Sequence, residues 1–210
     1  LERSGEGFVV RYAIADVAAF VSPGDPIDQM ASKRGETLYG ADSKIPLHPK
    51  VISEAAASLL PDQTHPALLW TLRLDASGLT TQARVERALV KSTAKLDYVG
   101  VQELFDQDQV DPMLALLKEI GELLQAQEIS RGGVSLPLPA QEIDVVQANW
   151  TLVHRKQLPV EHWNAQISLL TGRAAASMML EAGVGILRTL PEADPRDLDR
   201  LRHVASAVGV

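Results

Sequence analysis

The chain has 210 residues, of which 46% are hydrophobic and 22% charged, and its formal net charge is −7. This length buries a core in one large domain or two small ones, and these proportions are ordinary for a globular protein. The chain contains no cysteine and no run of eighteen apolar residues, which excludes disulfides, thiolate metal sites and a membrane-spanning helix.

The first residues have neither an initiator methionine nor a charged stretch followed by an apolar core. They are therefore not a signal peptide, and we expect a chain cut from a longer one. A cytoplasmic location agrees with the lack of cysteine. The net charge, taken alone, argues against nucleic-acid binding, although a buried RNA channel can be locally basic on an acidic protein.

Strands and short helices alternate in the first ninety residues. Apolar and β-branched runs predict the strands, and the turn Asp75–Gly78 predicts that two of them form a hairpin. A proline in the first turn predicts the start of one helix, and a proline after an alanine-rich segment predicts the end of another. The expected elements are strands at 8–15, 68–75 and 80–90, helices at 26 to 33 or 34 and at 51–60, and an irregular loop at 35–49.

Helices dominate the remainder. Helical spacing of apolar residues predicts buried stripes on two of them. The expected elements are a helix at 110–129, a hairpin of strands 142–146 and 151–155, a helix at 159–180 and a last helix from Pro195. The second stripe consists of Trp163, Ile167, Leu170, Ala174 and Met178. We therefore expect a mixed α/β (α+β) fold, with a mixed sheet flanked by helices in one domain.

The residue patterns themselves support no complete active site. The five histidines are scattered, without the close spacing of a zinc site. Residues 106–117 lack the glycine and glutamate of a calcium loop. The pairs Gly132-Gly133 and Gly183-x-Gly185 match no phosphate loop, and no G-x-S-x-G nucleophile motif is present. The chain itself is expected to hold no metal.

Short segments nevertheless follow one another in an order and spacing that resemble a known family. They are the apolar run Tyr12–Val21 containing Asp16, the pair Gly35–Tyr39 and Ile45–Pro49, the element Ser58–Pro61, the turn Leu74–Gly78, the segment Ser92–Tyr98 and the step Arg131–Gly133. Together they resemble the ribonuclease II / RNase R family, and the likeness to its RNB catalytic domain covers nearly the whole chain. Ala57 stands where the family usually has cysteine.

The resemblance implies processive 3′-to-5′ hydrolysis of single-stranded RNA to nucleoside 5′-monophosphates, with Mg²⁺ activating water. The family's magnesium ligands are aspartates in the pattern D-x(5)-D-x-D-D, which would precede Leu1. We therefore expect residues 1–210 to be an internal, partial RNB domain that lacks this cluster and the C-terminal part. The isolated chain should be inactive, with no DNA or membrane partner. The alternative is a catalytically inactive RNB-like module that binds RNA or acts as a scaffold.

The resemblance also points to individual residues. Tyr39 matches a tyrosine that stacks on RNA bases, and stacking tolerates any sequence. Tyr98 matches a tyrosine near the scissile phosphate, where its hydroxyl positions phosphate or water. Asp16 organises the catalytic site, and Gln166, expected to bind RNA, stands where the family often has a glutamate near the active site. Glu161 is the alternative equivalent of that glutamate, and each role competes with a purely structural one.

A partial domain has a consequence for stability. If covering elements are missing, the strand 8–15 and the last helix should expose apolar faces. We therefore expect the isolated chain to associate or to be marginally stable.

Overall fold

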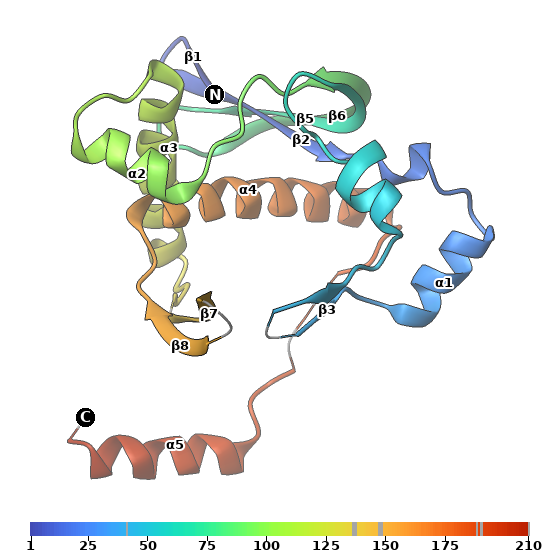
Figure 1. Ribbon diagram of the computed structural model, residues 1–210. Coiled ribbons are helices and arrows are strands. Elements are labelled where there is room, and N and C mark those ends of the chain that lie inside the picture. The colour runs from blue at the N-terminus through green and yellow to red at the C-terminus, as the bar shows by residue number, and fades with distance from the viewer. Residues whose placement is uncertain (41, 136–137, 147–148, 188, 190, 210) are drawn as a thin grey trace. The chain divides into compact units, whose positions relative to one another are not determined.

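The computed structural model describes residues 1–40, 42–135, 138–146, 149–187, 189 and 191–209. The chain forms two compact units, Leu1–Ala174 and Ala175–Val210 (Figure 1). Within these described ranges, no helix has the length and apolar character needed to cross a lipid bilayer.

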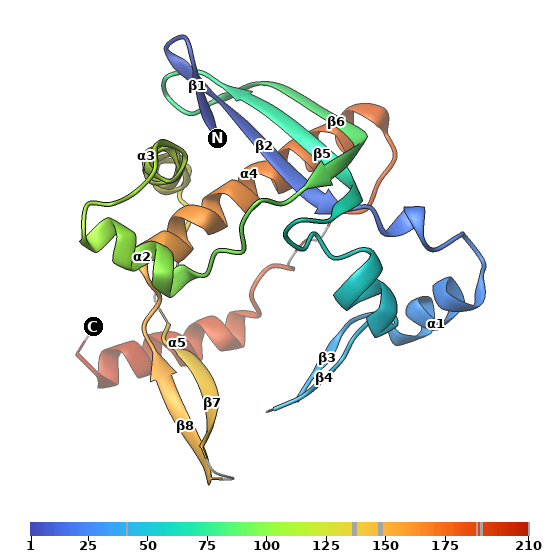
Figure 2. The same ribbon diagram turned by 45° about the horizontal axis from the view of Figure 1, so that its top comes forward.

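A four-stranded sheet forms the centre of the first unit (Figure 2). Its order is β1 (Glu2–Ser4), β2 (Gly7–Ala15), β5 (Thr64–Leu74) and β6 (Thr80–Lys91). The predicted strands and the mixed α/β class are confirmed, but every neighbouring pair in this sheet is antiparallel rather than mixed. For β1–β2 and β5–β6 the reason is local, because tight turns can join only antiparallel neighbours.

The predicted turn between β5 and β6 is built by one aspartate and one glycine. The Asp75 carboxylate accepts hydrogen bonds from the backbone N–H groups of Ser77 and Leu79, at 2.9 and 3.0 Å. Gly78 has φ +82°, a conformation that side chains disfavour. This short, self-bonded turn fixes the register, in which Leu72 lies opposite Ala83 and Trp70 opposite Val85.

The face of the sheet that carries Val10 and Leu72 is buried. Helix α4 (Pro159–Ala182) lies against this face, where the hydroxyls of Tyr12 and Ser168 are 3.1 Å apart. The predicted α4 stripe is confirmed for its first four members, which are buried. Met178 is 37% exposed, so its assignment to the buried stripe was wrong.

Two further helices pack on α4. Helix α3 (Pro112–Ser130) confirms a prediction, whereas α2 (Tyr98–Asp106) was not predicted. An apolar cluster joins the three helices through Val101, Leu114, Val160 and Trp163. At Gly121 the helices α3 and α4 come so close that an added Cβ would lie 2.7 Å from the Cα of Trp163.

The segment 35–49 was expected to be irregular, and this was wrong in part. It contains a small hairpin of β3 (Leu38–Tyr39) and β4 (Lys44–Ile45). Thr37 and Arg34 hold it, since the Thr37 hydroxyl accepts from Leu47 N–H at 3.1 Å and Arg34 donates to the Pro46 carbonyl. Such tertiary bonds are invisible to local patterns. The flanking elements are α1 (Pro26–Arg34), as predicted, the 3₁₀ turn η1 (Val17–Ala19) and the π-helix η2 (Ile52–Ala56), where a longer helix was expected.

The predicted second hairpin is confirmed as β7 (Ala140–Val146) and β8 (Asn149–Arg155). Residues 147 and 148 of its expected turn lie outside the described residues. The second unit contains the end of α4 and the predicted last helix, α5 (Pro195–Ala207), whose first turn is capped by Asp194. No described residue beyond Ala174 is buried.

Candidate functional site

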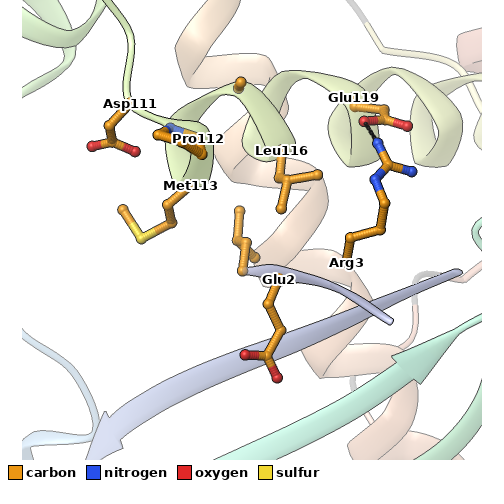
Figure 3. A pocket seen from close by; sticks show the side chains of 9 residues that line it. Glu2, Arg3, Asp111, Pro112, Met113, Leu116 and Glu119 are labelled. Atoms are coloured by element: carbon orange, nitrogen blue, oxygen red, sulfur yellow. Dashed lines mark hydrogen bonds and ion pairs between the residues drawn. The ribbon is translucent and has the colours of Figure 1, made fainter. Parts of the chain in front are cut away.

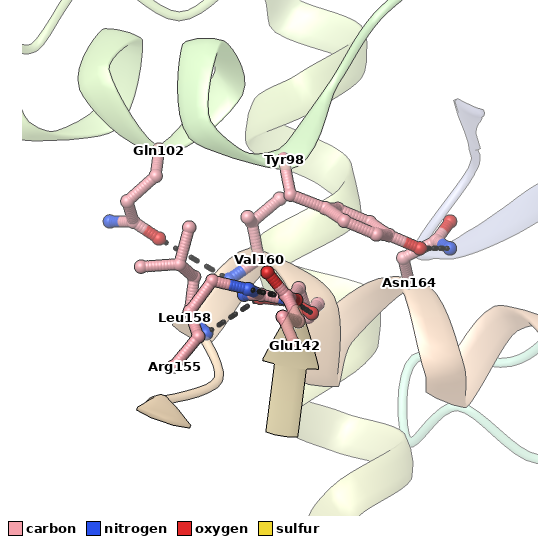
Figure 4. Close-up of polar contacts among 8 residues, drawn as sticks. Tyr98, Gln102, Glu142, Arg155, Leu158, Val160 and Asn164 are labelled. Carbon is pink, nitrogen blue, oxygen red and sulfur yellow. Dashed lines mark hydrogen bonds and ion pairs between the residues drawn. The ribbon is translucent and has the colours of Figure 1, made fainter. Parts of the chain in front are cut away.

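Tyr98 is the first residue of α2, and its position is fixed by a helix cap. The Asp97 side chain accepts from the Gly100 N–H at 2.9 Å, a standard way to begin a helix. The Tyr98 ring extends toward α4, where the Asn164 side-chain amide donates to the phenol oxygen at 3.0 Å (Figure 4). The side chain of Tyr98 remains 42% exposed, so a ligand can reach it.

Glu161, one of the two candidates for the family's glutamate, has partners within the chain. Its carboxylate accepts from Arg155 at 2.6 Å and from the Leu158 N–H at 2.9 Å, which caps the start of α4. Arg155 also pairs with Glu142 at 2.8 Å. The hydrogen bond from Arg155 holds the pKa of Glu161 below its ordinary value, and Glu161, followed by Glu142, raises the pKa of Arg155.

Gln166, the other candidate, is 7% exposed. Its side-chain amide donates to a carboxylate oxygen of Glu128 on α3, at 2.6 Å. Two residues along a helix correspond to a rotation of roughly 200°, so Gln166 and Asn164 lie on different sides of α4. The geometry gives Gln166 a packing contact between two helices, and its contact with RNA stays a prediction.

Asp16 lies where β2 ends and η1 begins, and it is 3% exposed. Its carboxylate is 3.0 Å from Nε of Arg87, whose side chain is 67% exposed. The backbone N–H of Asp16 donates to the Pro66 carbonyl at 3.2 Å. Asp16 therefore connects the end of β2 to β5, through Pro66, and to β6, through Arg87. Beside it lies a hollow of about 360 Å³, lined by Ala15, Val17, His48, Ile52, Ser53, Ala57, Ser58 and Leu59.

Tyr39 is placed on the β3–β4 hairpin, opposite Lys44. Its side chain is 80% exposed, so it is not packed in the core. Lys44 pairs in turn with Glu54 at 3.3 Å, which connects the hairpin to η2. The exposed ring has both the chemistry and the access needed for stacking on a base.

The structure does not join the four predicted residues into one hydrogen-bonded site. Across the described residues, no hydrogen bond or ion pair links any two of Asp16, Tyr39, Tyr98 and Gln166. Tyr98 and Gln166 are connected through α4, whereas Asp16 and Tyr39 lie on other elements. In the same ranges, no three His, Cys, Asp or Glu side chains come together as a metal site.

Another hollow, of about 800 Å³, lies between β1 and α3 (Figure 3). Arg3 and Glu119 form an ion pair of 2.5 Å at its edge. Its lining consists of Leu1, Glu2, Arg3, Asp111, Pro112, Met113, Ala115, Leu116 and Glu119. None of the predicted site residues belongs to it, so its size does not make it the candidate site.

Sequence reasoning did not identify Asn164 or Arg155. Asn164 meets Tyr98 across 66 residues of chain, and no motif in the sequence marks that contact. Arg155 bonds to Glu161, six residues later, across the turn into α4. The cap that the Glu161 side chain forms on the Leu158 N–H was recognisable in principle, because glutamate at the third helical position is a known cap signal.

Comparison with known proteins agrees with this architecture. Ribonuclease R of Escherichia coli K12 is 30% identical over 142 residues, which cover 64% of this chain and 18% of that protein. The exosome complex exonuclease RRP44 homolog A of Arabidopsis thaliana is 26% identical over 208 residues, which cover 94% of this chain and 22% of that protein. The chain thus spans less than a third of the length of these curated relatives.

Solved structures with low identity show the same fold. RNase R of Mycoplasma genitalium in complex with double-stranded RNA superposes with a TM-score of 0.88 at 19% identity, over 100% of this chain and 39% of that one. Yeast Ssd1, described as a pseudonuclease, superposes with a TM-score of 0.53 at 20% identity, over 61% of this chain and 16% of that one. The family model of the RNB domain matches residues 1–208. The chain therefore belongs to the RNB domain family, as its motifs predicted.

Proposed function

We propose that the chain is part of a processive, cytoplasmic 3′-to-5′ exoribonuclease that hydrolyses single-stranded RNA to nucleoside 5′-monophosphates. The observation that carries the proposal is the match of the RNB domain over residues 1–208. The curated relatives include Ribonuclease R and an exosome exonuclease. A related RNase R structure contains ribose-methylated single-stranded RNA, with a TM-score of 0.89 at 20% identity.

Magnesium belongs to the proposal only for the complete enzyme. The described residues bring no three candidate ligands together, so the donors present do not fit a magnesium site by themselves. We propose that the ligands are carboxylates outside residues 1–210, and that residues 1–210 form a partial RNB domain. When bound, magnesium would activate water and stabilise the leaving oxygen.

The roles proposed for this chain's own residues are binding and positioning. Tyr39, with its exposed ring, stacks on a base without regard to sequence. Tyr98 donates its hydroxyl proton to a phosphate oxygen. Asp16, held by Arg87, fixes the end of β2 beside the site. Gln166 would reach RNA only if it exchanged its bond to Glu128 for one to the ligand.

RNA binding by the purified chain tests the proposal directly. We expect fluorescent single-stranded RNA to bind in a salt-dependent manner, and DNA of the same sequence to compete poorly. Tyr39→Ala should weaken binding by about 1–3 kcal/mol, the usual contribution of one stacked base. In magnesium buffer the RNA should stay intact. A folded chain that binds no RNA at low salt would refute the proposal.

A second candidate is a catalytically inactive RNB-like module that binds RNA or acts as a scaffold. The described residues hold no cluster of three metal ligands, which fits both candidates, because the proposed magnesium ligands lie outside residues 1–210. The two candidates differ in the complete protein rather than in this chain. Expression of the whole reading frame and measurement of nucleoside 5′-monophosphate release in magnesium buffer would decide, since only the enzyme releases them.

A further inference from the structure

We infer that Asn164 is a positioning residue for Tyr98, which directs the phenol proton toward a phosphate oxygen of the RNA. The inference rests on the proposed function and deepens it. It starts from the single contact in which the Asn164 side-chain N–H group points at the Tyr98 oxygen, at 3.0 Å. No motif or resemblance had singled out Asn164.

The direction of this hydrogen bond decides what Tyr98 can do. A phenol hydroxyl both accepts and donates, but it has only one proton to donate. Because the Asn164 N–H donates, the phenol oxygen is the acceptor and its proton is not consumed. Within the described residues Tyr98 has no second hydroxyl partner. The proton is therefore left for a ligand, and an anionic phosphate oxygen is a strong acceptor.

Both partners of the contact are held rigidly. Tyr98 begins α2, whose N-terminus is capped by Asp97. Next to Asn164, Trp163 is 8% exposed and packs edge-on against Phe105 of α2, with ring centroids 4.9 Å apart. The same packing that joins α2 to α4 thus sets the hydroxyl position. Groups fixed before the ligand arrives lose little entropy on binding it.

A second tyrosine, Tyr12 of β2, contacts the same helix and provides a natural control. One turn beyond Asn164, Ser168 contacts the Tyr12 hydroxyl at 3.1 Å. The serine hydroxyl can donate or accept, so this pair imposes no direction on the phenol proton. Tyr12→Phe removes a tyrosine hydroxyl that contacts the same helix but leaves the Tyr98–Asn164 hydrogen bond in place, and it should leave RNA affinity unchanged.

The test is a double-mutant cycle on RNA affinity, measured by fluorescence anisotropy at fixed salt. Asn164→Asp keeps the shape but turns the donor into an acceptor, which captures the Tyr98 proton. Asn164→Leu removes the bond without adding charge. We expect Y98F, N164D and N164L each to weaken binding about tenfold, the effect of losing one hydrogen bond to a charged group. In the Y98F background, N164L should have little further effect.

Charge and folding need their own controls. Ser168→Asp adds the same charge one turn away, and its effect should be equal with and without Y98F, unlike that of N164D. Melting temperatures establish that each variant is folded, and N164L remains informative if N164D is not. If N164L and N164D bind RNA as tightly as the wild-type chain does, the inference is overturned but the proposed function is not. A folded wild-type chain without RNA affinity would overturn the proposed function, and the inference with it.

Discussion

The two compact units use the same local signals but reach different degrees of burial. In residues 1–174, the helices α2 and α3, capped by Asp97 and Asp111, bury apolar residues against other helices. In residues 175–209, α5 has an equally regular cap at Asp194. Its large apolar residues nevertheless stay 40–64% exposed; they are Leu198, Leu201 and Val204.

The difference shows that a cap and an apolar stripe specify a helix, but not its partner. Helical stability in proteins comes mainly from packing of the apolar face, and α5 lacks that contribution within its own unit. The expectation of an uncovered apolar face holds for α5. It was wrong for the start of the strand 8–15, where Phe8, Val9 and Val10 are at most 3% exposed, whereas Ile14 is 42% exposed.

Truncating one leucine in each unit tests this contrast with the largest expected effect. Leu72 is fully buried in the sheet, whereas Leu201 is 64% exposed on α5. Leu72→Ala should lower the free energy of unfolding by about 3 kcal/mol, and Leu201→Ala by less than about 0.5 kcal/mol. Urea unfolding followed by circular dichroism measures both. Equal losses would mean that α5 is packed as firmly as the sheet.

Two glycines sharpen the comparison by locating the tight packing inside the first unit. A Cβ on Gly121 would lie 2.5 Å from the Cβ of Trp163, whereas a Cβ on Gly172 would meet nothing within 4 Å. Gly121→Ala should destabilise by about 1–3 kcal/mol. Gly172→Ala should stabilise by about 0.5–1 kcal/mol, because alanine favours a helix interior. Thermal melts suffice, and a neutral Gly121→Ala would refute the close helix crossing.

The smallest expected effect is on the dependence of stability on pH. The test compares two carboxylates whose pKa values are both lowered. Arg155 lowers the pKa of Glu161, whose side chain is 14% exposed. A lowered folded-state pKa contributes stability above the unfolded value, near 4.5, and this contribution is lost as pH falls through the folded value. Glu161→Gln should therefore cost about 1–2 kcal/mol at neutral pH and flatten the loss of stability below pH 4.5.

The matched variant lies in the second unit. Arg196 likewise lowers the pKa of Asp194, but this carboxylate is solvent-exposed and its pair is screened by salt. Asp194→Asn should leave the main unfolding transition and its acid dependence unchanged. If it shifted that transition as much as Glu161→Gln, the two caps would contribute equally and the contrast between the units would fail.

Much of the fold was predictable because its signals are local. The turn at Asp75–Gly78 and the alternating strands around it specified the β5–β6 hairpin. The spacing of Trp163, Ile167 and Leu170 specified the buried face of α4. The β3–β4 hairpin and α2 were missed, since they are short and depend on contacts with distant segments, such as the bond from Arg34 to Pro46.

The candidate site was less predictable than the fold. The motifs pointed to Asp16, Tyr39, Tyr98 and Gln166 one at a time, without their partners. Those partners come from other elements. Arg87 is 71 positions from Asp16 in the sequence, and Glu128 is 38 positions from Gln166. Only the packing of the sheet and helices brings such pairs within hydrogen-bond distance.

The close crossing of α3 and α4 also limits how the chain can change by mutation. The atoms that would clash with a side chain at Gly121 include the Cα of Trp163, which every amino acid possesses. No replacement of Trp163 can therefore restore a Gly121→Ala variant. A selection for second-site suppressors should return changes elsewhere along the two helices, where they widen the crossing, and none at position 163.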